Sequence, residues 1–275
     1  MASSSSTGAH PTSDEAPLLR QPPPSVEELE KCQDQNGLLP PEEWPQVDHL
    51  VTEDDVPVDN IYSEKQQRLL TESLYASWDG PGAGRPFITL ANVGLFYSIN
   101  RPALVPDVLV SVDVAFPADI WEKRHRSYMI WQYDKPPEVV IEIVSNKVGG
   151  EDDAKLRSYA RMGIAYYVIY DPTTQLSDHV LRLYELRPTT YVLLEAFWLP
   201  GVELGLTLWQ GKFEDREDTW LRWCDREGQL LLTGVERAEQ ERQRADQERQ
   251  RAEQAQQEVE RLAARLRELG LEPDG

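Results

Sequence analysis

The strongest constraint on the fold is a pair of apolar runs that flank one short amphipathic segment. The first, PEVVIEIVS, covers residues 137–145, and the second, IAYYVIYDP, covers residues 164–172. Between them, residues 151–162 place apolar side chains on one side of a predicted helix, which Gly163 ends. Strands that are apolar on both faces are typical of a sheet that is covered on both sides. This strand–helix–strand unit therefore predicts an α/β (mixed α+β) fold, with helices on both faces of a mixed sheet.

Further segments on both sides of this unit extend the prediction. Residues 63–78 place leucines and a tryptophan at helical spacing and end at the turn sequence DGPG. The segments 86–97 and 106–116, PFITLANVGLFY and PDVLVSVDVAF, are strand-like. Residues 181–186 and 190–199 are rich in leucine, valine and aromatic residues, and we expect them to add antiparallel strands.

The composition divides the chain into three parts. Residues 1–45 are rich in Ser, Pro, Gln and acidic residues, which predicts a disordered N-terminal arm. Residues 46–225 contain the strand and helix patterns of the folded domain. From residue 226 to residue 275 the pattern changes, because the sequence QERQRA at 240–245 recurs at 247–252. This heptad spacing predicts a helical tail, either a solvated single helix or a coiled coil.

The apolar seam of the tail improves toward its C-terminal end. Two heptad positions form the seam, occupied by Ala238, Ala245, Ala252, Val259 and Leu266 and by Glu241, Glu248, Ala255, Leu262 and Leu269. Alanine buries little apolar area, so the early heptads contribute little to association. We therefore expect any homodimer to form through residues 259–269.

Charge and hydropathy limit the partners of the chain. A net charge of -20 is unfavourable for wide contact with nucleic acid, which usually requires a basic face. The best local basic patch is EKRHRSY at 122–128, which offers Lys123, Arg124 and Arg126 to a phosphate backbone or is a solvated loop. The sequence has no apolar run of about 18 residues and no signal peptide at its start, so we expect a cytoplasmic protein without a membrane span.

Glu142 is a carboxylate inside the apolar run 137–145, and a buried carboxylate without a partner costs several kcal/mol at least. Asp107 follows Pro106 at the start of another predicted strand, and Lys155 lies one turn into the following helix with Tyr159 at i+4. Two carboxylates on neighbouring strands and a lysine suit Mg²⁺ or Mn²⁺ bound to a phosphodiester. Each residue also has a simpler interpretation: Asp107 in a turn, Glu142 at an exposed edge, and Lys155 paired with Glu151.

The segments PDVLVSVDV and RSYMIWQYDKPPEVVIEIVSNKVGGEDDAKLRSYARMGIAYYVIYDP closely resemble the Uma-type family, whose members are assigned as restriction endonucleases of the PD-(D/E)XK superfamily. The resemblance covers roughly residues 55–210 and is most specific from Pro137 to Pro172. It implies a restriction-endonuclease-like core with Asp107 and Glu142 as metal ligands.

The chain departs from the superfamily signature at one position. The lysine expected two residues after the acid is replaced by Val144, and the resemblance implies that Lys155 on the next helix takes its place. Lys147, in the loop SNKVGG, is a poorer substitute and a weak candidate for DNA contact. Glu64 resembles the position from which related nucleases supply an additional acidic or polar group.

The resemblance and the residue pattern together predict a magnesium-dependent DNA endonuclease. The alternative is a catalytically inactive adaptor that keeps the nuclease fold and acts through its coiled-coil tail. The displaced lysine and the acidic net charge are compatible with this alternative.

Overall fold

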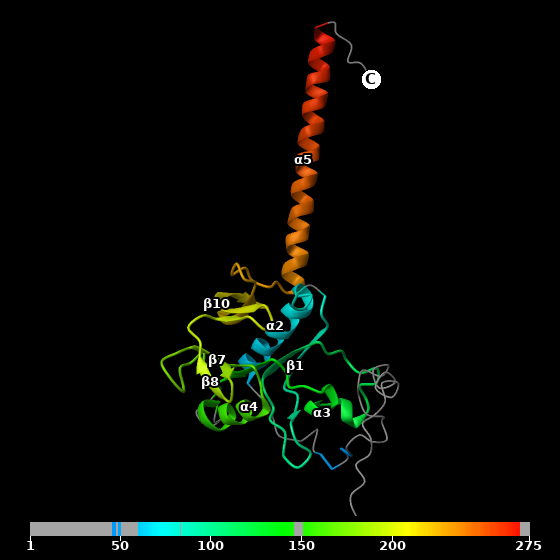
Figure 1. Ribbon diagram of the computed structural model, residues 1–275. Helices are drawn as coiled ribbons and strands as arrows, with labels where there is room; N and C mark the ends of the chain where they lie inside the picture. The colour runs from blue at the N-terminus through cyan, green and yellow to red at the C-terminus, as the bar shows by residue number, and fades with distance from the viewer. Residues whose placement is uncertain (1–45, 48, 51–59, 83, 146–150, 270–275) are drawn as a thin grey trace, which may run out of the picture. The chain divides into compact units, whose positions relative to one another are not determined.

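The computed structural model describes residues 46–47, 49–50, 60–82, 84–145 and 151–269 (Figure 1). The expected N-terminal arm, residues 1–45, lies outside the described residues. The central element is a six-stranded sheet with strand order β1-β3-β5-β6-β7-β8. Its strands are β1 (Phe87–Ala91), β3 (Val108–Val112), β5 (Val139–Ile143), β6 (Tyr166–Tyr170), β7 (Leu181–Arg187) and β8 (Thr190–Leu193).

The predicted strand–helix–strand unit forms the middle of this sheet. Strands β5 and β6 pair in parallel, whereas the other neighbouring strands of the sheet pair antiparallel, which confirms a mixed sheet. Every residue of β3, β5 and β6 is buried, as apolar runs of this kind require. The helix between β5 and β6 begins as a π-helical turn, Glu151–Lys155, and continues as α4, Leu156–Met162. Gly163 ends it in the left-handed conformation with φ 83°, as its position in the sequence predicts.

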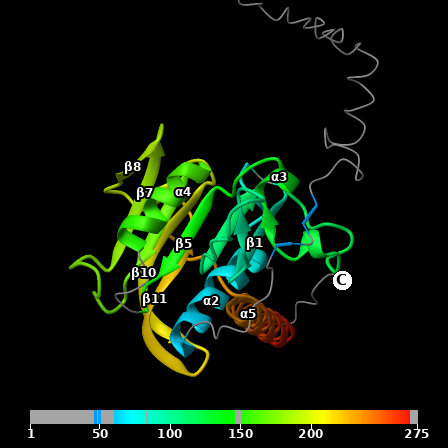
Figure 2. The same cartoon turned by 90° about the horizontal axis from the view of Figure 1, so that it is seen from below.

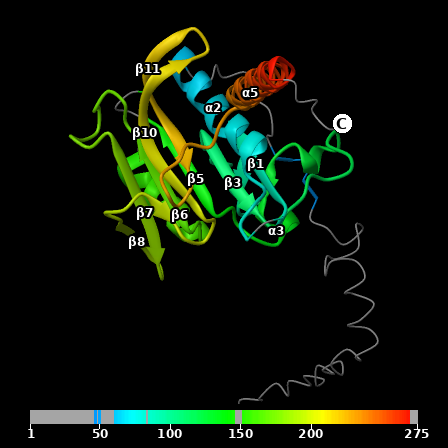
Figure 3. The same ribbon diagram turned by 90° about the horizontal axis from the view of Figure 1, so that it is seen from above.

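The two faces of the sheet are covered by different structures. Helix α4 covers one face, where Tyr159 and Met162 pack on Val140 and Tyr167 (Figure 2). The opposite face packs against α2 (Ile61–Ser77) and a second, three-stranded sheet (Figure 3). This second sheet has the order β11-β10-β9 and consists of β9 (Trp198–Leu199), β10 (Leu204–Phe213) and β11 (Arg216–Cys224). Helices therefore pack on both faces, as expected, and on this side a second sheet, which the sequence did not predict, completes the cover.

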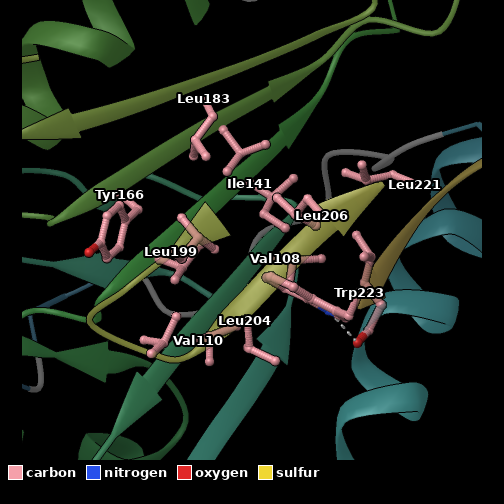
Figure 4. Packing of buried hydrophobic residues seen from close by; sticks show 14 of the residues in the cluster. Val108, Val110, Ile141, Tyr166, Leu183, Leu199, Leu204, Leu206, Leu221 and Trp223 are labelled. Carbon is pink, nitrogen blue, oxygen red and sulfur yellow. Dashed lines mark hydrogen bonds between the residues drawn. The ribbon is translucent and has the colours of Figure 1, made fainter. Parts of the chain in front are cut away.

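The interface between the two sheets is the larger core. Val108, Val110 and Ile141 from the central sheet face Leu204 and Leu206 from β10 (Figure 4). Trp223 on β11 fills the space beside α2 and donates its indole N–H to the carbonyl oxygen of Leu70, at 3.0 Å. Burial of this apolar area, at about 25 cal/mol per Å², stabilises the packing of α2 and the second sheet on the first.

Several smaller elements lie between β1 and β5 along the chain, in addition to β3. They are β2 (Leu95–Phe96), a 3-10 turn (Lys123–His125), β4 (Tyr128–Met129) and α3 (Ile130–Tyr133), and β2 pairs in parallel with β4. The predicted strand 86–97 is thus two strands, β1 and β2. They are separated where Asn92 adopts a φ of 53°, a conformation that a continuous strand excludes.

The C-terminal segment forms the predicted helix, α5 (Gly234–Glu268). Thr233 caps it through a capping box with Glu236, whose carboxylate also pairs with Arg222 on β11. Every residue from Ala238 to Leu262 is exposed. No helix in the described part of the chain combines the length and the apolar character that a membrane span requires.

Candidate active site

Asp107 and Glu142 lie at facing positions on neighbouring strands. Strand β3 pairs antiparallel with β5, with Val108 opposite Ile141, so one further step of the ladder places Asp107 opposite Glu142. Side chains at directly opposed positions have Cβ atoms about 4.5–5.5 Å apart. Both carboxylates are buried, with 8% of Asp107 and 2% of Glu142 exposed. The sheet therefore brings two acidic side chains together at the edge where β5 ends.

Helix α4 supplies the groups that compensate the buried charge of Glu142. The hydroxyl of Tyr159 donates a hydrogen bond to Oε1 at 2.6 Å, and Nζ of Lys155 lies 2.9 Å from Oε2. Lys155 and Tyr159 are one turn apart, so both project from the same side of the helix onto β5. Lys155 thus contacts the carboxylate of the strand; the side chain of Glu151, its simpler expected partner, lies outside the described residues. The contact with Lys155 also answers why a carboxylate is tolerated inside an apolar strand.

The hydroxyl of Tyr159 remains a proton donor over the ordinary pH range. Burial raises the pKa of Tyr159 well above its usual value, and the negative charge of Glu142 raises it further. The charge of Asp107 acts in the same direction, which shows that both carboxylates influence this hydroxyl. A neutral tyrosine thus orients Glu142 without adding charge to the site.

Asp107 is held by amide groups from two other elements. The side-chain N–H of Gln67, on α2, donates to Oδ1 at 2.8 Å, and the backbone N–H of Ile143 donates to Oδ2. The side-chain amide of Asn92, after β1, donates to the side-chain amide oxygen Oε1 of Gln67 at 2.9 Å. These bonds hold the carboxylate of Asp107 in one position, so Asp107 is not an isolated turn residue.

Gln67 and Asn92 were not singled out from the sequence. Gln67 is 4% exposed and its neighbour Gln66 is fully buried, although glutamine side chains are mostly exposed in folded proteins. Asn92 interrupts an otherwise continuous apolar strand pattern. Both signals are visible in the sequence, but only the fold shows that Gln67 reaches Asp107 and that Asn92 holds Gln67.

The remaining sequence candidates lie elsewhere. Glu64 is on the first turn of α2, is exposed and pairs with Arg68 at 3.0 Å, whereas Gln67 is the residue of this helix that reaches Asp107. Lys147 lies outside the described residues. The basic residues Lys123, Arg124 and Arg126 lie in and after the 3-10 turn that follows β3, at the end of this strand opposite to Asp107.

The two carboxylates are a donor set that fits a hard divalent cation. Mg²⁺ binds through one or two carboxylates together with waters and substrate phosphate oxygens, so it does not require a cage of protein ligands. Among the described residues there is no group of three or more His, Cys, Asp or Glu side chains that could hold a metal ion. A pair of buried oxygen ligands beside a lysine thus fits magnesium bound with its substrate better than a closed structural site.

A comparison with protein families identifies the chain. The family model "Uma2: Putative restriction endonuclease" matches residues 55–209, more than half of the sequence. The chain belongs to the Uma2 family. The Uma2 match includes α2, Asp107, Glu142 and α4, and the mixed sheet has the restriction-endonuclease-like fold that the resemblance implied. It ends within β10, so β11 and α5 lie outside the matched residues. No curated protein matches the chain.

Proposed function

We propose that this Uma2 protein is a magnesium-dependent endonuclease that hydrolyses phosphodiester bonds in DNA. The observation that carries the proposal is the pair of buried carboxylates, Asp107 and Glu142, opposed on β3 and β5, with Lys155 at 2.9 Å from Glu142. The family description, a restriction endonuclease, supports the same reaction class. Asp107 and Glu142 would hold the ion, for which Mn²⁺ can substitute.

Each residue of the site has a distinct role in this reaction. A bound Mg²⁺ supplies Lewis-acid polarisation of the phosphoryl oxygen and lowers the pKa of a bound water. Gln67 and the N–H of Ile143 orient Asp107, while Tyr159 orients Glu142. The ammonium of Lys155, whose side chain is 24% exposed, can reach the substrate, where it orients the attacking water or stabilises the developing negative charge.

Cleavage of supercoiled plasmid by the purified protein tests the proposal. We expect nicking with Mg²⁺ or Mn²⁺, and its loss in Asp107→Ala and in Glu142→Ala. Lys155→Ala should lower the rate about 100-fold or more, as removal of one transition-state donor does, while metal binding measured by calorimetry changes little. Asp113→Ala is the matched control, because Asp113 is exposed at the other end of β3 and pairs with Arg85.

Two results would contradict the proposal. One is wild-type protein that nicks plasmid under no metal condition and behaves like a variant in which Asp107, Glu142 and Lys155 are all replaced by alanine, which would favour the adaptor. The other is Mn²⁺ affinity that is unchanged when both Asp107 and Glu142 are replaced.

A further inference from the structure

The segment between β3 and β4 exposes three large apolar side chains within six residues. Phe116, Ile120 and Trp121 are 53%, 52% and 77% exposed. Trp121 is the largest of them and leaves most of its indole in solvent. Contiguous exposed apolar side chains of this size mark interaction sites on folded proteins.

Hydrogen bonds hold the backbone on both sides of Trp121. The carboxylate of Asp119 accepts from the N–H of Trp121 at 2.8 Å, and Nε of Arg126 donates to the Trp121 carbonyl oxygen at 3.1 Å. The ring of His125 lies against the carbonyl oxygen of Asp119 and closes the loop. Tyr128, fully buried in β4, then anchors the loop to the domain. The indole is thus presented by an ordered loop, which lowers the entropy that a partner must overcome on binding.

The loop carries a cluster of basic side chains although the chain as a whole is acidic. Lys123, Arg124 and Arg126 follow Trp121 within five residues. Within residues 116–126 the carboxylates are Glu122, which pairs with Arg124 at 3.2 Å, and Asp119, which accepts the Trp121 N–H. Charges within a Debye length of about 8–10 Å of the indole act on a phosphate that approaches it. An aromatic face with adjoining cations suits a nucleotide, which offers a base to stack and a phosphate to pair.

We propose that the loop at residues 116–126 binds unpaired nucleotides, with a base stacked on Trp121 and phosphates beside Lys123, Arg124 and Arg126. This inference rests on the proposed nuclease function and names its substrate class, DNA that has a single-stranded region near the cut. Bases in a duplex are stacked on both faces, so only an unpaired base offers a free face to the indole.

The loop and the carboxylate pair lie at opposite ends of β3. Strand β3 lies between Asp107 and the start of the loop, and its five residues span about 17 Å at about 3.3 Å per residue. A substitution of Trp121 should therefore leave the carboxylate pair unchanged.

Binding of labelled oligonucleotides, measured by fluorescence anisotropy in EDTA so that cleavage cannot interfere, tests the inference. The probes are single-stranded dT20 and a blunt duplex annealed from two complementary strands. Trp121→Ala should weaken binding to dT20 roughly 5- to 100-fold, because stacking of a base on an aromatic ring contributes on this scale, and should leave duplex binding unchanged. Trp121→Phe should retain most of the affinity. The matched control is Ile61→Ala, since Ile61 is 79% exposed at the start of α2.

The inference is overturned if Trp121→Ala and wild type bind dT20 with equal affinity, or if the variant loses affinity equally for both probes. It is also overturned if Trp121→Ala changes the sedimentation of the protein without DNA, which would assign the loop to contacts between copies of the chain. Circular dichroism confirms that the variant is folded. If wild type shows Trp121-dependent binding of dT20 but never cleaves DNA, this inference stands and the proposed nuclease activity fails. If Asp107 and Glu142 prove essential for cleavage while Trp121→Ala binds dT20 normally, the proposed nuclease activity stands and this inference fails.

Discussion

At the scale of single residues, the buried carboxylate of Glu142 connects α4 to the sheet. One of its oxygens accepts a bond from Tyr159 on α4 and the other from Lys155, at the end of the π-helical turn that leads into α4. A hydrogen bond to a charged group contributes about 1.5–3 kcal/mol, more than a bond between neutral groups. The same contacts that make a carboxylate tolerable in β5 therefore also fix the position of the helix that carries Lys155.

Tyr159→Phe should lower the free energy of unfolding by about 1.5–3 kcal/mol, because it removes the hydroxyl donor from a buried charge and keeps the ring packing. Urea denaturation measures this change. The matched control is Tyr128→Phe, in which another fully buried hydroxyl loses neutral partners, Ser111 and the carbonyl of Lys135. We expect a cost of about 0.5–1.5 kcal/mol there. Equal costs in the two variants would show that Glu142 does not depend on Tyr159 for its charged form.

At the scale of elements, two adjacent glutamines give α2 two different functions. The side chain of Gln66 forms two hydrogen bonds to the backbone of Leu221, at 2.8 and 2.9 Å, so α2 is attached to the edge of β11. The side chain of Gln67 holds Asp107 at 2.8 Å. One helix thus joins the second sheet to the candidate site.

The two glutamines predict opposite phenotypes for the same substitution. Gln66→Ala should lower the free energy of unfolding by about 1–3 kcal/mol, since two buried backbone groups lose their partner, and leave Mn²⁺ affinity almost unchanged. Gln67→Ala should instead weaken Mn²⁺ binding and DNA cleavage, because Asp107 loses its orientation. Chemical denaturation and calorimetry on both variants separate the effects. Metal affinity that falls more in Gln66→Ala than in Gln67→Ala contradicts this division.

At the scale of the whole molecule, the residues that join the folded domain to α5 pack on the domain. The change in composition begins at residue 226, but α5 begins only at Gly234. Leu231 is buried in the larger core and Thr233 is 3% exposed. The guanidinium of Arg222, with no exposed side-chain surface, binds both carboxylate oxygens of Glu236 at 2.9 and 2.7 Å. Two further bonds attach the first turns of α5 to α2: Glu72 accepts from the N–H of Gly234, and Arg237 donates to the carbonyl of Ala76.

Truncation tests where the domain ends. A chain that ends after Gly234 loses Glu236 and leaves Arg222 buried without its carboxylate, so it should be less stable by about 3 kcal/mol. A chain that ends after Ala238 keeps the pair and should unfold at nearly the same temperature as the full-length protein. Thermal melting of the two chains makes the comparison, and equal melting temperatures would show that this ion pair does not stabilise the domain.

The same pair predicts how the difference depends on pH. Burial raises the pKa of Glu236, but hydrogen bonds from Arg222 and Thr233 and the charge of Arg222 outweigh it, so its pKa is lowered overall. A group with a lowered pKa contributes stability above its unfolded pKa, about 4.3, and loses it as the pH falls through the folded value. The difference in melting temperature between the two truncated chains should therefore be largest near neutral pH and shrink in acid.

The exposed seam at the end of α5 leads to a prediction about association. Val259, Leu262 and Leu269 are 60%, 50% and 63% exposed, whereas the earlier heptads place alanines and glutamates in the seam. If the full-length protein is a dimer, Leu262→Gln together with Leu266→Gln should make it a monomer, while Ala245→Gln should not. Sedimentation velocity measures both, and a dimer that survives the leucine substitutions contradicts the assignment to residues 259–269.

Local patterns determined most of the secondary structure. The apolar runs at 137–145 and 164–172 became the paired strands β5 and β6, Gly163 became the cap of α4, and the heptad repeat became α5. These features depend on residues that are neighbours in the chain, because periodicity of 2 or 3.6 residues and the left-handed conformation of glycine are local properties. The family resemblance likewise rests on contiguous sequence, and it placed the chain in Uma2.

Only the tertiary structure decided which distant residues meet. Gln67 and Asp107 are 40 positions apart, and Arg222 and Glu236 are joined only because β11 passes beside the start of α5. The second sheet shares one face of the central sheet with α2, and no local pattern specifies which surface a strand such as β10 will pack on. Contacts of this kind depend on the path of the whole chain, so the sequence determined the elements, and the packing between them determined which side chains surround Asp107 and Glu142.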